Sequence, residues 1–324
     1  MTDHPGLATL DAAADVVHRV MPPTPQYCWP LLSRRVGTEL WVKHENHTPT
    51  GAFKLRGGLV YLDELKRSQP NIAGVISATT GNHGQSIAHA ATRLGLKATI
   101  VAPHGNSPEK NRAMEAFGAT LIERGHDFQA AYEFAIATAA NENLHLVRSY
   151  HPLLVRGVAS YALELLRAVP DLDIVYVPIG QGSGICGLVA AREALGLKTE
   201  IVGVVAASAP AYALSFAAGK PISSNSADTF AGGLAVRTPD PMALDIICGS
   251  VARIVTVSEE EMRGAIRTIF SDTHNVAEGA GAAAFAAALQ ERGRLSGKKI
   301  AVIQSGGNID RPLFAEILAE APRS

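Results

Sequence analysis

Regular alternation of short strand-like runs with helical runs is the feature that most limits how this chain can fold. From Gly37 onward, short apolar runs are each followed by a longer run with helical periodicity. The apolar runs do not alternate with polar residues, as is typical of strands buried on both faces. Parallel strands are joined by helices that cover both faces of a sheet. We therefore predict an α/β fold with two open, mostly parallel twisted sheets, each flanked by helices.

The order of these runs also predicts two domains. Residues 51–150 hold four strand-like runs of their own, so we expect a small mobile domain there and a large domain from residues 1–50 and 151–324. Residues 219–241 are polar and irregular, as in a lid or surface excursion. Expected strands are 40–43, 74–77, 97–101, 119–122, 144–147, 174–178, 200–205, 253–257 and 299–304. Expected helices are 51–65, 84–94, one from 107, 128–140, 153–168, 184–195, 211–218, 259–270, 279–290 and 311–319.

Composition excludes several classes of protein. The 324 residues are 47% hydrophobic and 18% charged, with a net charge of -1. That balance does not favour binding to nucleic acid or anionic lipid, and no run is apolar enough to span a bilayer. Residues 1–5 lack the pattern of a secretion signal, so we expect a cytoplasmic protein. The scattered cysteines Cys28, Cys186 and Cys248 fit neither a disulfide framework nor a metal site.

Lys54 is the first candidate for chemistry. It follows Thr50 by four residues, and Thr50 is a suitable N-cap for the helix expected over 51–65. An ammonium near the positive end of a helix loses its proton more easily, and a neutral amine can attack an aldehyde. The alternative is an ordinary solvated lysine on a helix.

A glycine-rich turn over residues 180–184 is the second candidate. It follows the strand expected to end at Pro178 and precedes a helix, so backbone N–H groups and the helix dipole converge there. This arrangement is typical of a phosphate site, although a tight strand-to-helix turn alone needs one or two glycines. The loop lacks the lysine of an ATP-binding P-loop, and its place in mid-chain disfavours a dinucleotide site.

Two further polar loops also end strands. Residues 79–83 carry hydroxyls and an amide that suit a carboxylate or the phenolic oxygen of a cofactor, or that cap their own helix. Ser305 would lie at the tip of the last strand, in a segment that could equally be a plain Gly-Gly turn. Because ligands bind beyond the carboxyl ends of parallel strands, these loops are expected to converge.

At this point the chain resembles a known family, the fold-type II pyridoxal-phosphate enzymes, and within them the threonine/serine dehydratase and serine racemase branch. The resemblance covers nearly the whole chain and implies a tryptophan synthase β-like fold with pyridoxal 5'-phosphate in the cleft between the domains. It rests on Lys43-His44-Glu45-Asn46, Thr50-Gly51-Ala52-Phe53-Lys54-Leu55-Arg56-Gly57, Gly81-Asn82-His83-Gly84-Gln85, Gly180 to Gly184, Ala277-Glu278-Gly279-Ala280-Gly281 and Ser305-Gly306-Gly307-Asn308.

The resemblance implies a role for each motif. Lys54 would hold the cofactor as a Schiff base and act as the base at the substrate's Cα. The cofactor would also be bound by Phe53, Asn82, Gly180, Gln181, Gly182, Ser183, Gly184, Glu278 and Ser305. The substrate carboxylate would be bound by Thr79, Thr80, Gly81, Asn82 and His83.

The expected reaction is β-elimination. Ser305 would meet the pyridine nitrogen, and a serine hydroxyl cannot keep that nitrogen protonated, which makes the ring a weaker electron sink. Losing a β-hydroxyl as the Cα–H bond breaks avoids a long-lived carbanion. We therefore expect a dehydratase that converts a β-hydroxy amino acid such as threonine or serine to a 2-oxo acid and ammonia. A racemase with Thr80 as second acid/base is the alternative. A β-replacement synthase and a non-catalytic binding protein are further options.

Departures from the family pattern limit other properties. Val205 and Ala211 occupy the places where some relatives bind a divalent cation, so no metal is expected there. Gly232 replaces a family acid, and His44 and His47 are expected to cap a turn or touch the substrate. A homodimer is expected because dimers are common in the family. The chain leaves no room for a C-terminal regulatory domain, so we expect amino acid catabolism.

Overall fold

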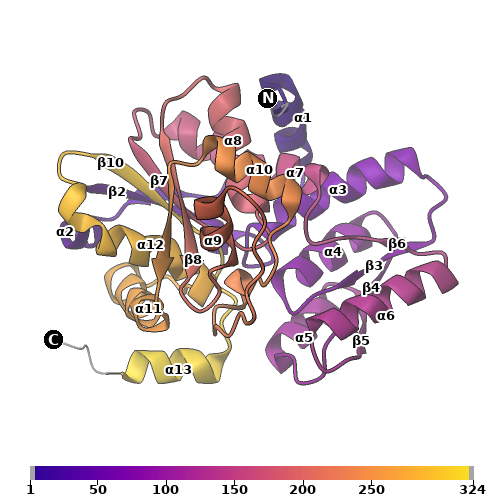
Figure 1. Cartoon of the computed structure of the whole chain (residues 1–324). Helices are drawn as coiled ribbons and strands as arrows, with labels where there is room; N and C mark the ends of the chain where they lie inside the picture. Colours follow the sequence, from indigo (N-terminus) through magenta and orange to yellow (C-terminus); the bar gives the residue numbers. More distant parts are fainter. Residues whose placement is uncertain (1–3, 321–324) are drawn as a thin grey trace.

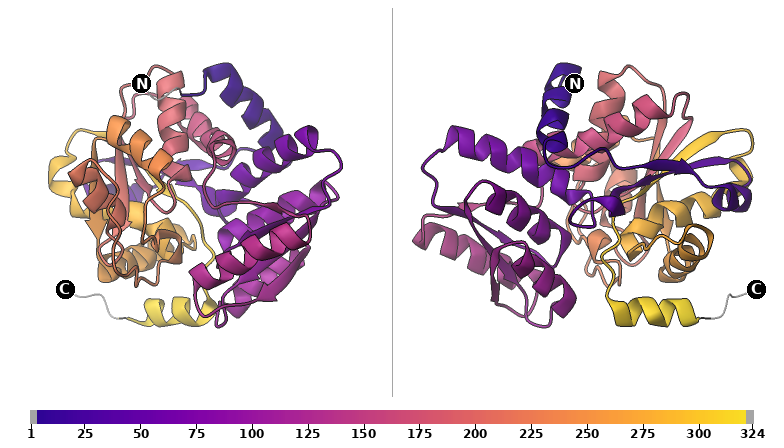
Figure 2. Two further views of the ribbon diagram at one scale, coloured as in Figure 1. Left: turned by 45° about the vertical axis from the view of Figure 1, so that its right-hand side comes forward. Right: turned by 180° about the vertical axis from the view of Figure 1, so that it is seen from behind.

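The structure is a computed structural model that describes residues 4–320 (Figure 1). It contains two sheets, each with helices on both faces, as Figures 1 and 2 show. The α/β prediction of two mostly parallel sheets is therefore confirmed. The expected absence of a leader concerns residues 1–5, of which residues 1–3 lie outside the described range.

The larger sheet has six strands in the order β1-β2-β10-β7-β8-β9. Its strands pair in parallel, except that the edge strand β1 is antiparallel to β2. The bounds are β1 Gln26–Cys28, β2 Glu39–His44, β7 Ile174–Pro178, β8 Glu200–Ala206, β9 Arg253–Val257 and β10 Lys299–Gln304.

Side chains of these strands point alternately to two separate cores, as a period of two requires. On one face, Val175 and Val177 of β7 pack with helices α7, α8 and α10. On the other face, Ile174 and Tyr176 of the same strand pack with α2, α11 and α12. The bounds are α2 Pro30–Val36, α7 Pro152–Ala168, α8 Ser183–Ala194, α9 Ala211–Ala218, α10 Pro241–Ser250, α11 Glu259–Thr273, α12 Gly279–Gln290, α13 Arg311–Ala319, and the 3-10 turns Glu45–His47, Gly232–Leu234 and Arg292–Arg294.

The smaller sheet has four parallel strands in the order β5-β4-β3-β6. Val75 of β3 packs with α1, α3 and α4, whereas its neighbour Ile76 packs with α6 on the opposite face. The bounds are β3 Gly74–Ala78, β4 Lys97–Ala102, β5 Ala119–Glu123, β6 His145–Leu146, α1 Leu7–His18, α3 Lys54–Ser68, α4 Asn82–Arg93, α5 Pro108–Ala116 and α6 Phe128–Asn141.

The two sheets draw their strands from different parts of the sequence. Strands of the small sheet lie between residues 74 and 146, and those of the large sheet lie on either side of that interval. The domain division at residues 51–150 and the mobility of that unit remain predictions. No helix within residues 4–320 is long and apolar enough to cross a membrane.

Candidate active site

The turn before α3 places Lys54 at the first position of that helix. Thr48 Oγ1 accepts a hydrogen bond from the Ala52 amide at 2.9 Å and donates to the Ala52 carbonyl at 2.8 Å. Gly51 has a φ of +69°, a left-handed conformation that a helix cannot contain. The predicted helix start at residue 51, with Thr50 as N-cap, is therefore wrong. The predicted place of Lys54 in the first turn is right.

The segment at residues 305–308 lies against this turn. The Phe53 amide donates to the Ser305 carbonyl at 3.1 Å, and the Gly307 amide donates to the Gly51 carbonyl at 2.9 Å. Asn308 Nδ2 donates to the Thr50 carbonyl at 2.8 Å. Hydrogen bonds therefore join two segments that lie far apart in the sequence, next to Lys54.

The amine of Lys54 lies inside the protein beside the glycine-rich turn. Its Nζ is 3.4 Å from Ser183 Oγ and 5.1 Å from the centre of the Phe53 ring. Desolvation by the surrounding protein lowers the pKa of Lys54 to about 8, and the carboxylate of Glu278 opposes this shift. Burial is thus the main cause of the lowered pKa of Lys54.

The turn at residues 180–184 is closely packed and requires glycine at two of its positions. β7 ends at Pro178, and Gly182 takes a left-handed φ of +102° as the N-cap of α8. A Cβ on Gly182 would lie 2.6 Å from Ala243 Cβ, and one on Gly180 would lie 2.2 Å from the Gly233 carbonyl oxygen. Tyr161 Oη fixes the start of α8 by donating to the Gly184 carbonyl at 2.8 Å. The first amides of α8 have no acceptor within the helix, so they are free to bind phosphate.

The loop at residues 79–83 is tied to Glu278. Asn82 begins α4, and its Nδ2 donates to Glu278 Oε1 at 2.6 Å. Asn308 Nδ2 donates to Asn82 Oδ1 at 2.8 Å, which fixes the orientation of the amide. Burial raises the pKa of Glu278, while the charges of Lys110 and Lys54 and the bond from Asn82 oppose the increase.

His83 is buried beside this loop and is neutral at physiological pH. Desolvation, with the charge of Lys54 as second cause, lowers its pKa to about 3. Its Nε2 has no hydrogen-bond partner among residues 4–320. A buried ring nitrogen without a partner is costly, which indicates that a ligand or water completes the site.

A cavity of about 430 Å³ gathers all of the predicted site residues. Its walls include Phe53, Lys54, Thr79, Thr80, Gly81, Asn82, His83, Gly180, Gln181, Gly182, Ser183, Gly184, Glu278 and Ser305. A wider groove of about 670 Å³ beside α11 and α13 contains none of them. The individual roles of these residues remain predictions.

Other residues line the cavity that were not predicted as site residues. They are Asn106, Ser107, Lys110, Phe128, Ser149, Pro178, Ala280 and residues 232–236. Some had a signal in the sequence, because residues 232–236 belong to the expected lid, and Ser107-Pro108 marks a helix N-terminus. His44 and His47 do not line the cavity. Their rings stack at 5.1 Å, and Trp29 Nε1 donates to His44 Nε2 at 2.9 Å.

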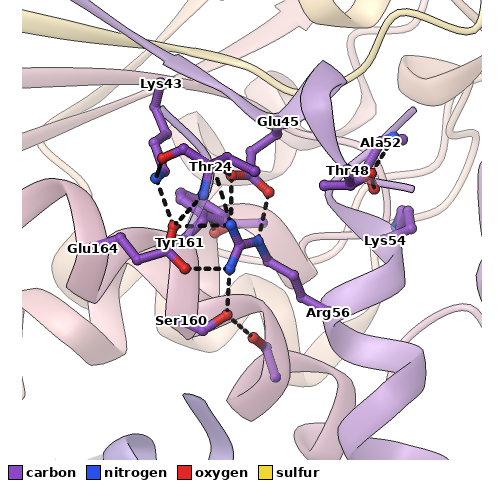
Figure 3. Close-up of polar contacts among 12 residues, drawn as sticks. Thr24, Lys43, Glu45, Thr48, Ala52, Lys54, Arg56, Ser160, Tyr161 and Glu164 are labelled. Atoms are coloured by element: carbon purple, nitrogen blue, oxygen red, sulfur yellow. Dashed lines mark hydrogen bonds and ion pairs between the residues drawn. The ribbon is translucent and has the colours of Figure 1, made fainter. Parts of the chain in front are cut away.

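A buried cluster of charged residues, also missed, anchors α3 two residues beyond Lys54 (Figure 3). Arg56 donates to Glu45 at 2.6 and 3.0 Å and to Glu164 at 2.6 and 2.9 Å. Lys43 Nζ donates to Glu164 Oε2 at 2.6 Å. Tyr161, which holds the glycine-rich turn, belongs to the same helix as Glu164. The cluster therefore links the lysine-bearing helix to α7 and, through α7, to the start of α8.

These features fit pyridoxal phosphate. The glycine turn can accept a phosphate, Lys54 supplies an amine of lowered pKa, and the unpartnered His83 Nε2 indicates a polar occupant.

Val205 is buried in β8 and Ala211 begins α9, so neither offers a metal-ligating side chain. Within residues 4–320 no group of three or more His, Cys, Asp or Glu side chains could hold a metal ion.

Comparison with known proteins defines the class. The profile of the family described as "Pyridoxal-phosphate dependent enzyme" matches residues 18–306. The chain belongs to this family of pyridoxal-phosphate-dependent enzymes.

Within that family, the chain is similar to ammonia-lyases. It is 33% identical to an L-threonine ammonia-lyase of Thermotoga maritima over 89% of this chain and 72% of the relative. The identity is 37% to the L-threonine ammonia-lyase of Geobacter sulfurreducens, over 86% of this chain and 69% of the relative. It is 32% to the L-threo-3-hydroxyaspartate ammonia-lyase of Saccharomyces cerevisiae, over 91% of both chains.

Solved structures show the same fold. Threonine deaminase isoform 2 from Solanum lycopersicum matches with a TM-score of 0.90 and 27% identity, covering 98% of this chain and 95% of that one. Maize serine racemase matches with a TM-score of 0.90 and 26% identity, covering 97% of each chain.

Proposed function

We propose that this chain is a pyridoxal-phosphate-dependent dehydratase, an ammonia-lyase, of a β-hydroxy amino acid such as threonine or serine. The products are a 2-oxo acid and ammonia. The observation that carries the proposal is the Lys54 amine, with its pKa lowered to about 8, lying 3.4 Å from Ser183 of the glycine-rich turn. The similarity to L-threonine ammonia-lyases supports the same reaction.

Three elements of the protein would hold the cofactor. The amides of residues 180–184 would hold its phosphate, the Lys54 amine would hold its reactive end, and Ser305 would offer a hydrogen bond to its ring nitrogen. Asn82 and Phe53 would also contact it. When bound, the cofactor supplies an electron sink for the pair released from the substrate's Cα–H bond.

Lys54 is suited to move the proton at Cα. Since its pKa is near 8, about a tenth of the amine is neutral at pH 7, far more than for an ordinary lysine, and the neutral form can accept a proton. A neutral Ser305 hydroxyl would offer the ring nitrogen a hydrogen bond but no charge, which would favour loss of the β-hydroxyl together with the α-proton. The substrate thereby loses water, and hydrolysis of the enamine product consumes one water and releases ammonia and the 2-oxo acid.

The loop at residues 79–83 would bind the substrate's α-carboxylate. Gly81 N donates to Thr79 Oγ1 at 3.2 Å, which fixes the loop at the start of α4. The N-terminus of α4 favours a negative charge at this place. The neutral His83 ring can form a hydrogen bond with the substrate or cofactor and adds no positive charge to the site.

Racemisation is the second candidate. Thr80 is exposed and lines the cavity, and within residues 4–320 its hydroxyl has no hydrogen-bond partner, so it is free to carry a proton as the second acid/base. The similarity in fold to serine racemase supports this alternative more weakly than sequence similarity supports the lyase.

A panel of 3-hydroxy amino acids of both configurations tests the function. We expect release of 2-oxo acid and ammonia in equal amounts from at least one of threonine, serine, 3-hydroxyaspartate and an aryl serine. Chiral chromatography of the remaining substrate measures racemisation in the same vessel. Conversion to the opposite enantiomer without release of 2-oxo acid would overturn the proposed lyase function and support the racemase instead.

The cellular setting is part of the proposal. We infer a cytoplasmic homodimer that degrades amino acids and whose residues 51–150 move as a unit. Gel filtration with light scattering tests the dimer. Scattering profiles with and without substrate test the movement.

A further inference from the structure

Lys110 is a second lysine in the cavity, and the proposed reaction gives it no role. It lies in the first turn of α5, in the part of the chain that carries the small sheet, and its side chain is half-buried at the cavity wall. Its Nζ has no hydrogen bond or ion pair to any residue between 4 and 320. A cation in a cavity without a protein partner is available for an anionic ligand.

The stem of Lys110 lies on the loop expected to bind the substrate carboxylate. A Cβ built on Gly81 would be 3.0 Å from Lys110 Cδ and 3.7 Å from its Cε. The glycine at position 81 therefore leaves room for this side chain to lie over the loop.

The charge of Lys110 also acts on Glu278 in the site. Burial raises the pKa of Glu278, and among the groups that oppose this shift Lys110 ranks ahead of Asn82 and Lys54. The positive charge of Lys110 thus helps to lower the pKa of Glu278, although the Lys110 nitrogen makes no ion pair with that carboxylate.

Contacts across the cleft hold Lys110 in this position. Ser107 Oγ donates to Asp310 Oδ1 at 2.6 Å, and the Arg311 amide donates to Glu109 Oε2 at 3.1 Å. The start of α5 is thereby joined to the start of α13, and Figures 1 and 2 show the two helices at the same end of the molecule. Ser107 Oγ also accepts from the Lys110 amide at 3.1 Å, so the same residue caps α5 and joins the two sides.

We propose that Lys110 binds the α-carboxylate of the amino acid substrate, acting from the small-sheet side together with the loop at residues 79–83. The inference rests on the proposed function, because it assigns the substrate of that same site. It adds a binding residue outside the motif loops. It also explains why the α5–α13 contacts matter, since they bring a charge over the substrate.

Lys110→Met removes the charge and keeps most of the stem. Because a hydrogen bond to a charged group contributes about 1.5–3 kcal/mol, we expect the KM for threonine to rise about 10- to 150-fold. The effect on kcat should be much smaller. Lys110→Arg, which retains the charge, should recover most of the affinity, whereas Lys198→Met on the exposed surface should change nothing.

Two probes separate binding of the carboxylate from a structural role. L-Alanine carries the carboxylate but no β-hydroxyl, so its dissociation constant from calorimetry reports binding without turnover and should weaken by the same factor. Threoninamide lacks the carboxylate, so Lys110→Met and the original enzyme should act on it with similar kcat/KM. Lys110→Gln provides a second neutral variant if the methionine variant does not fold.

The possible outcomes are distinct. A KM for threonine and a dissociation constant for alanine within twofold of the original would overturn the inference, as would equal losses with threonine and threoninamide. If no hydroxy amino acid yields a 2-oxo acid, the proposed function fails, and the alanine titration still decides whether Lys110 binds a carboxylate.

Discussion

Replacing Arg56 by methionine should destabilise the protein strongly. The Arg56 and Glu45 side chains are 0% exposed, and Glu164 is 7% exposed. Removing Arg56 leaves two buried carboxylates, with Thr24 Oγ1 as the donor left to Glu45 and Lys43 as the nearest cation to Glu164. Breaking a buried ion pair from one side costs about 3–5 kcal/mol because the remaining charge is uncompensated. We expect a loss of that size in the free energy of unfolding, measured by urea denaturation at pH 7.

A second substitution tests the reasoning behind that number. Adding Glu45→Gln to Arg56→Met removes one uncompensated charge, so the double variant should recover at least about 1 kcal/mol. Arg34→Met, on the exposed side of α2, is the matched control and should lie within about 0.5 kcal/mol of the original. A loss below about 1 kcal/mol for Arg56→Met, or no recovery in the double variant, would refute the argument.

Two further predictions concern pH and the glycine turn. Burial acts to raise the pKa of Glu164, but Arg56 and Lys43 outweigh it and lower the pKa to about 2. This stabilisation is complete above the unfolded-state pKa of about 4.5 and disappears as the pH falls towards 2. In urea denaturation, the free energy of unfolding should therefore fall more steeply with decreasing pH in the original protein than in Glu164→Gln. Gly182→Ala should weaken cofactor binding at least about tenfold in a fluorescence titration, because φ is +102° and the new Cβ would lie 2.6 Å from Ala243 Cβ. Gly219→Ala has a φ of +64° in open space and should leave cofactor affinity unchanged; equal weakening in both variants would contradict the argument.

The fold could be predicted because its signals are local. The alternation of short apolar runs with longer helical runs predicted both sheets. The strands at Arg253–Val257 and Lys299–Gln304 were predicted with their observed bounds. The helices α1, α2 and α10 and the antiparallel strand β1 were not predicted. The strand β1 and the helix α2 are short, and α1 packs against α3 and α7 rather than following a strong sequence pattern of its own, so tertiary packing stabilises these elements.

The site was predicted where glycine and hydroxyl residues follow strands. Those loops converge because the carboxyl ends of parallel strands share one edge of a sheet. The prediction of Thr50 as the N-cap was wrong because Gly51 and the Thr48 hydroxyl form a separate turn before the helix. Helix propensities of single residues do not include such a turn.

The supporting residues depend on contacts between distant parts of the sequence. Arg56 meets Glu164 across more than a hundred residues, and Ser107 meets Asp310 across the cleft. The desolvation that lowers the pKa of Lys54 likewise arises from surroundings that only the folded chain assembles.

The central claim is that the Lys54 amine holds the cofactor and moves the α-proton. The most direct measurement compares the original protein with Lys54→Ala, recording the visible absorbance of the bound cofactor and the release of 2-oxo acid, with Lys198→Ala as control. We predict that both signals disappear in Lys54→Ala and persist in the control. Undiminished release of 2-oxo acid by Lys54→Ala would contradict the account.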